Sequence, residues 1–210
     1  MFRRNVVCSV ALCLALTVGS FAQSGKVRGT AANAPITLQR AIASGKIAAE
    51  IMGTGASSGD SIKLKVRKRA KGPVTVTVPP GTMLRNSSGG EQDMVVSGVR
   101  GIDLGGGLIR PASRISLTSS SPVVVFLSAF CAAFEKNNPS RSTTFSVEPP
   151  DPTLACITRR AANLSVPAKQ AAVWMYTDRI SYGHMSQKFR VSSSEWSAAQ
   201  SVATACGVSP

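Results

Sequence analysis

A cysteine and a glutamine are the two side chains in this sequence whose pairing would give unusual chemistry. Cys131 follows Phe130 at the end of the apolar run PVVVFLSAFC, and Gln170 lies in the stretch SVPAKQAAVWMYTD, residues 165–178. Gln170 and Trp174 are four residues apart, so they share one face of the helix that this stretch predicts. If the two segments pack together, the Cys131 sulfur meets a side-chain carboxamide.

Two predicted elements would position this pair. Ser165 is a good helix cap, Pro167 stands near the first helical position, and a dense apolar run follows, so residues 165–178 are the best-specified helix in the chain. Residues 122–130 predict a strand that is apolar enough to be central in a sheet.

The first 22 residues have the features of an export signal. Arg3 and Arg4 precede an apolar run over residues 6–18, and Ser20 and Ala22 supply small residues at a cleavage site. No later apolar stretch reaches the roughly 18 residues that a membrane span requires. We therefore expect a cleaved signal peptide and a periplasmic or extracellular product without a transmembrane segment.

Three cysteines remain after such processing, and an odd number in an oxidising compartment leaves one to be explained. Cys156 and Cys206 each lie on a predicted helix. A disulfide between them would close a loop of about 50 residues and add roughly 4 kcal/mol of stability in the chain-entropy model. The alternative is two buried free thiols. With the disulfide formed, Cys131 is the unpaired cysteine.

The sequence KQAAVW, residues 169–174, resembles the Thr-Gln-x-Ala-aliphatic-Trp motif of the thioester domains of Gram-positive surface adhesins. In that family the glutamine is bonded to a cysteine that follows an aromatic residue or leucine, and Phe130-Cys131 matches. The resemblance implies a Cys131–Gln170 thioester that a partner's amine opens to leave an amide, with Phe130 and Trp174 as the water shield. Lys169 departs from the motif's threonine. The alternative is a buried cysteine beside a glutamine satisfied by hydrogen bonds.

A second likeness covers most of the chain after the signal. The order of GTGASSGD, a hairpin, PPGT, an aromatic–Cys strand and QAAVWMYTD is similar to a group of uncharacterised bacterial exported proteins. This likeness implies no activity.

The remaining candidates for catalysis do not form a recognisable constellation. Residues 55–59 fit Gly-x-Ser-x-Gly, but a basic strand follows them where a nucleophile elbow needs a helix. His184 is the only histidine, which argues against zinc clusters and makes a Cys/His pair possible only if the fold brings it to Cys131. A glycosidase would need carboxylates to converge, and the candidates are Glu135, Glu148, Asp151 and Asp178. We expect no enzyme, no metal and no cofactor.

The chain is basic, with 24 lysines and arginines against 10 acidic residues and a net charge of +14. This charge favours an anionic envelope polymer or a protein partner. The basic run KLKVRKRAK alternates as a strand with one solvated face, formed by Lys63, Lys65, Arg67, Lys68 and Arg69. No aromatic residue interleaves with the run, which disfavours nucleic acid.

About seven short strands, separated by Gly, Pro and Ser signals, are predicted before the helices. Residues 61–69 and 73–78 alternate in period two and are predicted to pair as a hairpin through AKG. We expect an α+β protein, an immunoglobulin-like antiparallel β-sandwich over residues 46–148 and a helical subdomain over 149–210, after a leader with a short helix over 23–45. The predicted function is a non-enzymatic exported binding or envelope module of unknown ligand, with the thioester-type protein as the alternative.

Overall fold

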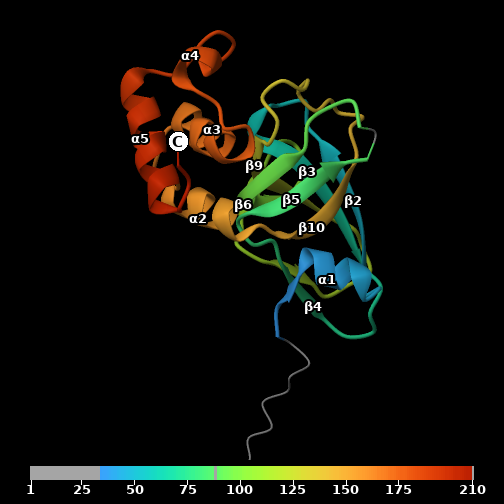
Figure 1. The fold of residues 1–210 in the computed structure, drawn as a ribbon. Coiled ribbons are helices and arrows are strands. Elements are labelled where there is room, and N and C mark those ends of the chain that lie inside the picture. Colours follow the sequence, from blue (N-terminus) through green and yellow to red (C-terminus); the bar gives the residue numbers. More distant parts are fainter. Residues whose placement is uncertain (1–33, 88, 210) are drawn as a thin grey trace, which may run out of the picture. The chain divides into compact units, whose positions relative to one another are not determined.

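The computed structural model describes residues 34–87 and 89–209, so the predicted signal peptide and residues 23–33 of the leader lie outside the described part. The described chain is a mixed α+β fold with two sheets (Figure 1). Its strands are β1 Ile36–Thr37, β2 Ile47–Gly53, β3 Ser58–Lys68, β4 Val74–Thr77, β5 Thr82–Asn86, β6 Met94–Asp103, β7 Ile109–Pro111, β8 Ile115–Leu117, β9 Val123–Cys131 and β10 Phe145–Pro150. Its helices are α1 Leu38–Ala43, α2 Pro152–Arg160, α3 Val166–Thr177, α4 Tyr182–Met185 and α5 Ser193–Ala205.

The larger sheet has the order β10-β5-β6-β9-β3-β2, and β7 pairs with β6 beside this path. All of its strand pairs are antiparallel, and β9 lies between β6 and β3 as its apolar sequence predicts. The two outer strands approach each other at one end. Met52 of β2 forms a bridge with Thr144, just before β10, and the Gly53 amide donates to the Thr143 carbonyl at 3.0 Å.

The period-two pattern sets which side chains enter the core. On β3, Ile62, Leu64 and Val66 are fully buried, while Lys63 and Lys65 between them are partly exposed. On β9, Leu127 and Val125 are the cross-strand partners of Ile62 and Leu64 and are also fully buried. The apolar face of the large sheet therefore forms one core, and the basic side chains stay on the opposite face.

The predicted hairpin between the third and fourth strands is wrong. β3 pairs with β2 and β9, whereas β4 pairs with β1 and β8 in a separate three-stranded sheet. After β3, the amides of Arg69 and Ala70 both donate to the carbonyl of Lys46, just before β2, and the chain then continues to β4 in the other sheet. The alternation of apolar and polar side chains correctly predicts a strand in each of the two segments. It carries no information on which other strand each segment pairs with.

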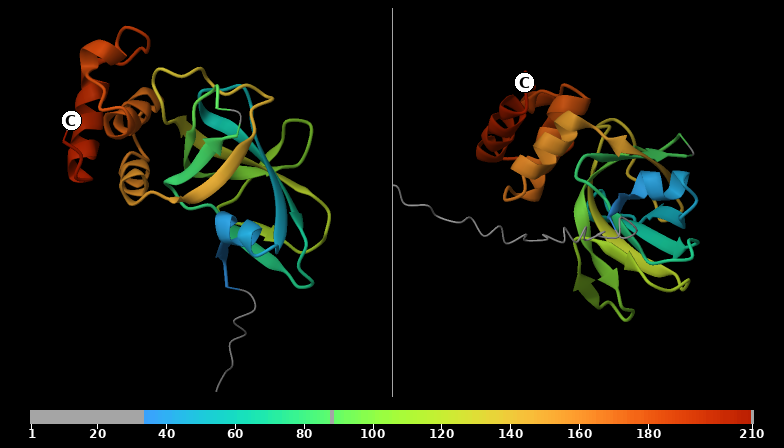
Figure 2. Two further views of the ribbon diagram at one scale, coloured as in Figure 1. Left: turned by 45° about the vertical axis from the view of Figure 1, so that its right-hand side comes forward. Right: turned by 90° about the horizontal axis from the view of Figure 1, so that it is seen from below.

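Helices α2, α3 and α5 pack together next to the ends of β6 and β9 (Figures 1 and 2). The change from strands to helices falls between Pro150 and Pro152, next to the predicted boundary, and the described residues belong to one compact unit. Ser165 caps α3, and Ser192 with Glu195 forms the predicted capping box of α5. The short helix α4 was not predicted.

A disulfide and a glycine fix the helices. Cys156 on α2 and Cys206 after α5, the pair expected from the sequence, are joined by a disulfide. Gly81 has a φ of +85°, and a Cβ at this position would lie 2.5 Å from the Ala155 nitrogen. Its carbonyl accepts a hydrogen bond from the Asp151 amide at 3.0 Å. Glycine therefore allows the PPGT turn to lie directly against the start of α2.

Candidate functional site

The structure brings Cys131 and Gln170 together. The Cys131 amide donates to Oε1 of Gln170 at 3.0 Å, and Nε2 of Gln170 donates to the Cys131 carbonyl at 2.8 Å. Both residues are 1% exposed. The carboxamide is thus held at both of its polar atoms by the backbone of the residue that carries the thiol.

The register of β9 explains why these backbone groups are free to bind a side chain. The next amide along the chain, that of Ala132, donates to the Asp93 carbonyl on the β6 side. Because successive residues of a strand alternate in direction, the Cys131 groups face the β3 side. There β3 begins at Ser58, which pairs with Phe130, so no strand residue is left for Cys131. Gln170 occupies the place of a strand partner.

Gln170 lies on the buried face of helix α3, which is otherwise apolar. Seven of its 12 residues are buried, and Gln170 is the only polar one among them. The Ser165 hydroxyl accepts from the Ala168 amide at 3.3 Å and donates to Oε1 of Glu195 at 2.7 Å, which also ties the start of α3 to α5. A glutamine at this depth requires partners for its amide, and the Cys131 backbone supplies them.

The Cys131 thiol is protonated and hydrogen-bonded. Sγ of Cys131 donates to the Ser57 carbonyl at 2.8 Å and lies 3.7 Å from Oδ1 of Asn138. Burial raises the pKa of this thiol to about 12, while the nearby Gln92 amide acts in the opposite direction. A thiol with this pKa stays protonated at neutral pH, which is unlike the thiolate of a redox or metal-binding cysteine.

Cys131 and Gln170 line a small cavity of about 140 Å³. Its walls include three aromatic rings. Trp174 packs edge-on against Phe134, with ring centroids 4.9 Å apart, and against Phe189 at 5.1 Å. The polar part of the lining comes from Ser57, Gln92, Lys136, Asn138 and Lys188.

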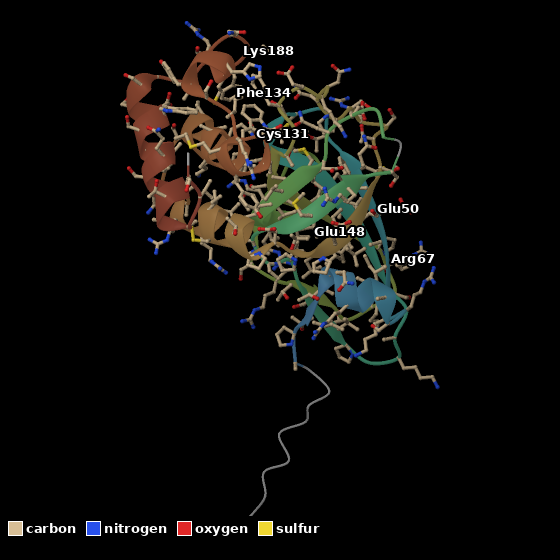
Figure 3. All side chains as sticks on the ribbon, viewed as in Figure 1. Glu50, Arg67, Cys131, Phe134, Glu148 and Lys188 are labelled. Atoms are coloured by element: carbon tan, nitrogen blue, oxygen red, sulfur yellow. A yellow bond between two sulfur atoms is a disulfide. The ribbon has the colours of Figure 1, made fainter. Side chains whose placement is uncertain are left out.

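An outer cluster packs over the Phe134 wall of the cavity. The Phe134 ring contacts the His184 ring at 5.1 Å, and the Lys188 ammonium lies 5.5 Å from its centroid. Glu135 forms ion pairs with Lys188 and, at 2.8 Å, with Nε2 of His184, and Lys188 is the main cause of the lowered pKa of Glu135. The Phe134 amide donates to Oδ1 of Asp178 at 3.0 Å, which fixes this loop to the end of α3. Figure 3 shows Cys131, Phe134 and Lys188 close to the helices.

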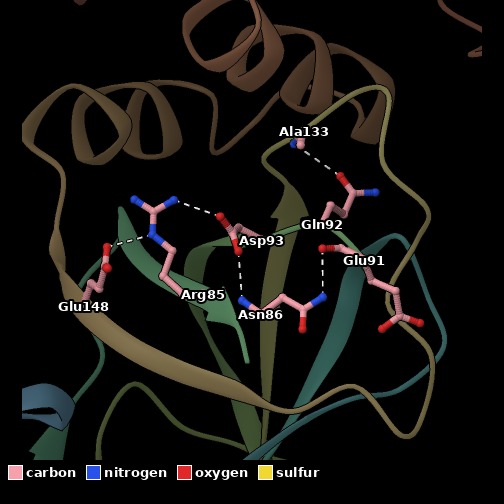
Figure 4. Close-up of polar contacts among 7 residues, drawn as sticks. All are labelled: Arg85, Asn86, Glu91, Gln92, Asp93, Ala133 and Glu148. Atoms are coloured by element: carbon pink, nitrogen blue, oxygen red, sulfur yellow. Dashed lines mark hydrogen bonds and ion pairs between the residues drawn. The ribbon is translucent and has the colours of Figure 1, made fainter. Parts of the chain in front are cut away.

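Gln92 is a second buried amide next to the thiol. It is 1% exposed; Nε2 donates to Oδ1 of Asn138 at 2.9 Å, and Oε1 accepts from the Ala133 amide at 3.3 Å (Figure 4). Sequence reasoning missed Gln92, Asn138 and Phe134. The signal available was an aromatic residue three positions after Cys131, in FCAAF.

Comparisons of the chain with family models, curated proteins and solved structures find no match.

Most of the other predicted site residues lie away from this cavity. Phe130, expected to shield the pair, points away from Cys131 because neighbours on a strand alternate, and it lines a different cavity beside Lys169. Trp174 does line the Cys131 cavity. Figure 3 shows Arg67 and Glu50 on the side of the sheet away from α3 and α5, and both line one hollow. Of the predicted basic surface, Lys65 pairs with Glu50 at 3.3 Å and lines a hollow with Arg67 and Arg69, and Lys68 donates to the Thr118 carbonyl at 3.1 Å.

The carboxylates named from the sequence serve separate partners. Glu148 pairs with Arg85 at 2.8 Å (Figure 4), and Asp151 caps α2 by accepting from the Leu154 amide at 2.8 Å. Within residues 34–87 and 89–209 no group of three or more metal-binding side chains gathers. None of the helices in this part has the length and apolarity that crossing a bilayer needs.

Proposed function

We propose that this chain is a thioester-type module that links itself covalently to a partner's amine through Cys131 and Gln170. The observation that carries the proposal is the pair of hydrogen bonds, at 3.0 and 2.8 Å, that hold the Gln170 carboxamide on the Cys131 backbone. Such a clamp keeps the carboxamide next to the residue that carries the thiol, and proximity of this kind favours attack of the thiol on the carboxamide.

The chemistry has two steps. In the first, Sγ of Cys131 bonds to the carboxamide carbon of Gln170, the C–N bond breaks, and the thiol proton leaves with the nitrogen as ammonia. In the second, a partner's primary amine attacks the same carbon, the S–C bond breaks, and the sulfur takes up a proton lost by the amine. The product is an amide between the chain and its partner, formed once per molecule without turnover.

The surroundings of the pair fit the needs of a thioester, which water would hydrolyse. Phe134, Trp174 and Phe189 form an apolar wall, and Cys131 and Gln170 are almost fully buried. The cavity of about 140 Å³ is of a size to admit a small amine or the end of a lysine side chain, but not a bulky nucleophile.

A purely structural role is the competing explanation. In that case Gln170 only completes the hydrogen bonding of β9, and the thiol remains bonded to the Ser57 carbonyl. The two explanations differ in covalent structure, so mass spectrometry separates them.

The test is the intact mass of the protein, purified from the exported fraction at neutral pH without added amines. The thioester lowers the mass by about 17 Da for lost ammonia, and methylamine then adds about 31 Da. Cys131→Ala and Gln170→Ala chains are the matched controls and should show neither change. A wild-type chain of full mass, with one titratable thiol after unfolding, contradicts the proposal.

Two expectations from the sequence belong to this proposal. One is export through a cleaved signal peptide at residues 1–22, which would bring the module to partners outside the cytoplasm. The other is an immunoglobulin-like sandwich, which is supported by the antiparallel pairing of the large sheet and by the second sheet. The N-terminal residue of the chain recovered from the exported fraction tests the first expectation, and an experimental structure tests the second.

A second candidate is a non-covalent module that binds an anionic envelope polymer or an acidic protein. The observation in its favour is the net charge of +14, together with the exposed side chains of Arg67 and Arg69 on the β2–β3 edge. Binding of this kind weakens steeply with salt. Retention on a polyanionic column, compared between the wild-type chain and a Lys63→Gln/Arg67→Gln/Arg69→Gln chain at several salt concentrations, tests it. Equal elution of the two chains contradicts it.

A further inference from the structure

Trp174 holds the one buried side-chain polar atom in the described residues that has no hydrogen-bond partner. The residue is 5% exposed, and its indole nitrogen, Nε1, is unpaired. A buried donor without an acceptor is costly, and native structures seldom keep one without a reason.

Packing explains the ring of Trp174 but not its N–H group. The ring is fixed by edge-on contacts with Phe134 at 4.9 Å and with Phe189 at 5.1 Å. A phenylalanine could make aromatic contacts of this kind without burying an unpaired donor. The indole N–H therefore needs an acceptor that the resting molecule does not provide.

The position of Trp174 points to that acceptor. It follows Gln170 by four residues on α3, which places the two side chains on one helical face, and both line the cavity that contains Cys131. The atom in this cavity that takes up the π electron pair when the carboxamide carbon is attacked is Oε1 of Gln170.

We infer that the Trp174 indole N–H is a hydrogen-bond donor to the acyl oxygen of Gln170 when that oxygen carries negative charge. The inference rests on the proposed function. The Cys131 amide, 3.0 Å from Oε1, is the first donor, and it belongs to the nucleophile itself. Enzymes that transfer acyl groups hold the oxyanion with two such donors, one of them commonly the amide of the nucleophilic residue.

The electron movements define when this donor acts. When Sγ attacks the carbonyl carbon, the π pair of the C=O bond moves onto Oε1, and the indole N–H and the Cys131 amide stabilise it. When the C=O bond re-forms, the C–N bond breaks and ammonia leaves with the thiol proton. In the second step an amine attacks, the same oxygen is charged again, and the S–C bond breaks. Trp174 thus acts in both thioester formation and opening.

The test replaces the indole N–H alone. Trp174 and Trp196 are the only two tryptophans, so in a Trp196→Phe chain residue-specific incorporation of 3-benzothienylalanine exchanges the N–H of Trp174 for sulfur without changing the ring shape. The measured quantities are the fraction of chains that have lost ammonia and the rate at which methylamine opens the thioester. We expect the opening rate to fall by about a hundredfold, or the thioester not to form.

Trp196→Phe with normal tryptophan at position 174 is the matched control, because Trp196 lies on α5 against Tyr182, with ring centroids 5.5 Å apart. The Trp196→Phe chain is the parent of the analogue. If the parent shows the mass loss and the thioester of the analogue opens at a rate within twofold of the parent's rate, the role of Trp174 is overturned and the thioester stands. A parent chain without the mass loss overturns both. Thermal unfolding of the analogue should be unchanged or raised, because an unpaired donor has been removed.

Discussion

Gln170 binds Cys131 in the way that a neighbouring strand would, with its Oε1 on the Cys131 amide and its Nε2 on the Cys131 carbonyl. This contact joins the end of β9 to the middle of α3, two segments that lie 39 residues apart in the sequence. The sheet and the helices therefore share a buried polar contact, and both partners of that contact are 1% exposed.

Replacing Gln170 by leucine should destabilise the fold. The change leaves the buried amide and carbonyl of Cys131 without partners, and each unpaired group costs about 1–3 kcal/mol. Urea unfolding of a chain with a free thiol at position 131 measures the loss. Gln187→Leu, at an exposed position, is the control and should stay within about 0.5 kcal/mol of the wild type. A similar midpoint for both variants would contradict the structural importance of the contact.

The thiol of Cys131 should make stability depend on pH in alkaline solution. Burial raises its pKa from 9.0 to about 12, so the folded state holds the proton between these values while the unfolded state loses it. Stability is therefore complete below pH 9 and falls by about 1.4 kcal/mol per pH unit from pH 9 towards pH 12. The measurement is urea unfolding from pH 8 to 11 on a chain with the free thiol. Cys131→Ala should lack this contribution, and equal slopes in the two chains would contradict the raised pKa.

The helix ends show how much of this fold the sequence could predict. The caps Ser165 and Ser192 act within one turn, so their positions follow from local residue types, and α3 and α5 begin where expected. The central place of β9 follows in the same way from its apolar run. The bond between Cys156 and Cys206 follows from counting cysteines in a chain expected to be exported.

The remaining features depend on contacts that no local pattern encodes. The partners of β4 are β1 and β8, which come from distant parts of the chain, and Gln92 reaches the thiol from a loop 39 residues before Cys131. The Phe134 wall likewise depends on the fold of the loop after β9, which Asp178 fixes from the end of α3. Such tertiary placement explains why Phe130 was predicted as a shield while Phe134 lines the cavity.

Loss of the disulfide should lower stability by about 4 kcal/mol in the chain-entropy model, because Cys156 and Cys206 close a loop of 50 residues. That loop contains α3 and hence Gln170. Urea unfolding of Cys156→Ser/Cys206→Ser against the wild type measures the effect, and the double variant avoids a new free thiol. A loss below about 1 kcal/mol would show that the packing of α3 against α5 holds the helices without the bond.

Gly81→Ala should be among the most damaging single-methyl changes. The backbone at Gly81 has a φ of +85°, and the added Cβ would lie 2.5 Å from the Ala155 nitrogen and 2.7 Å from its Cα. Strain and overlap each cost about 1–3 kcal/mol, so α2 must shift or the fold must lose several kcal/mol. Gly72→Ala is the matched control, because a Cβ there meets no atom within 4 Å. The measurement is thermal unfolding of both variants. Equal melting temperatures would contradict the close approach of Gly81 to Ala155.

Phe134→Ala should open the cavity around Cys131. Phe134 is 8% exposed, and its ring packs between the Trp174 ring and the Lys188 and His184 side chains, so its removal exposes Cys131 and Gln170 to solvent. We expect Cys131 to react with a maleimide about tenfold faster or more, or the thioester, where present, to be opened faster by methylamine to a similar degree. Phe145→Ala is the control for general destabilisation, because Phe145 is 7% exposed on β10 and does not line this cavity. If both variants react equally fast, the added reactivity comes from global unfolding and Phe134 is not the wall that protects the thiol.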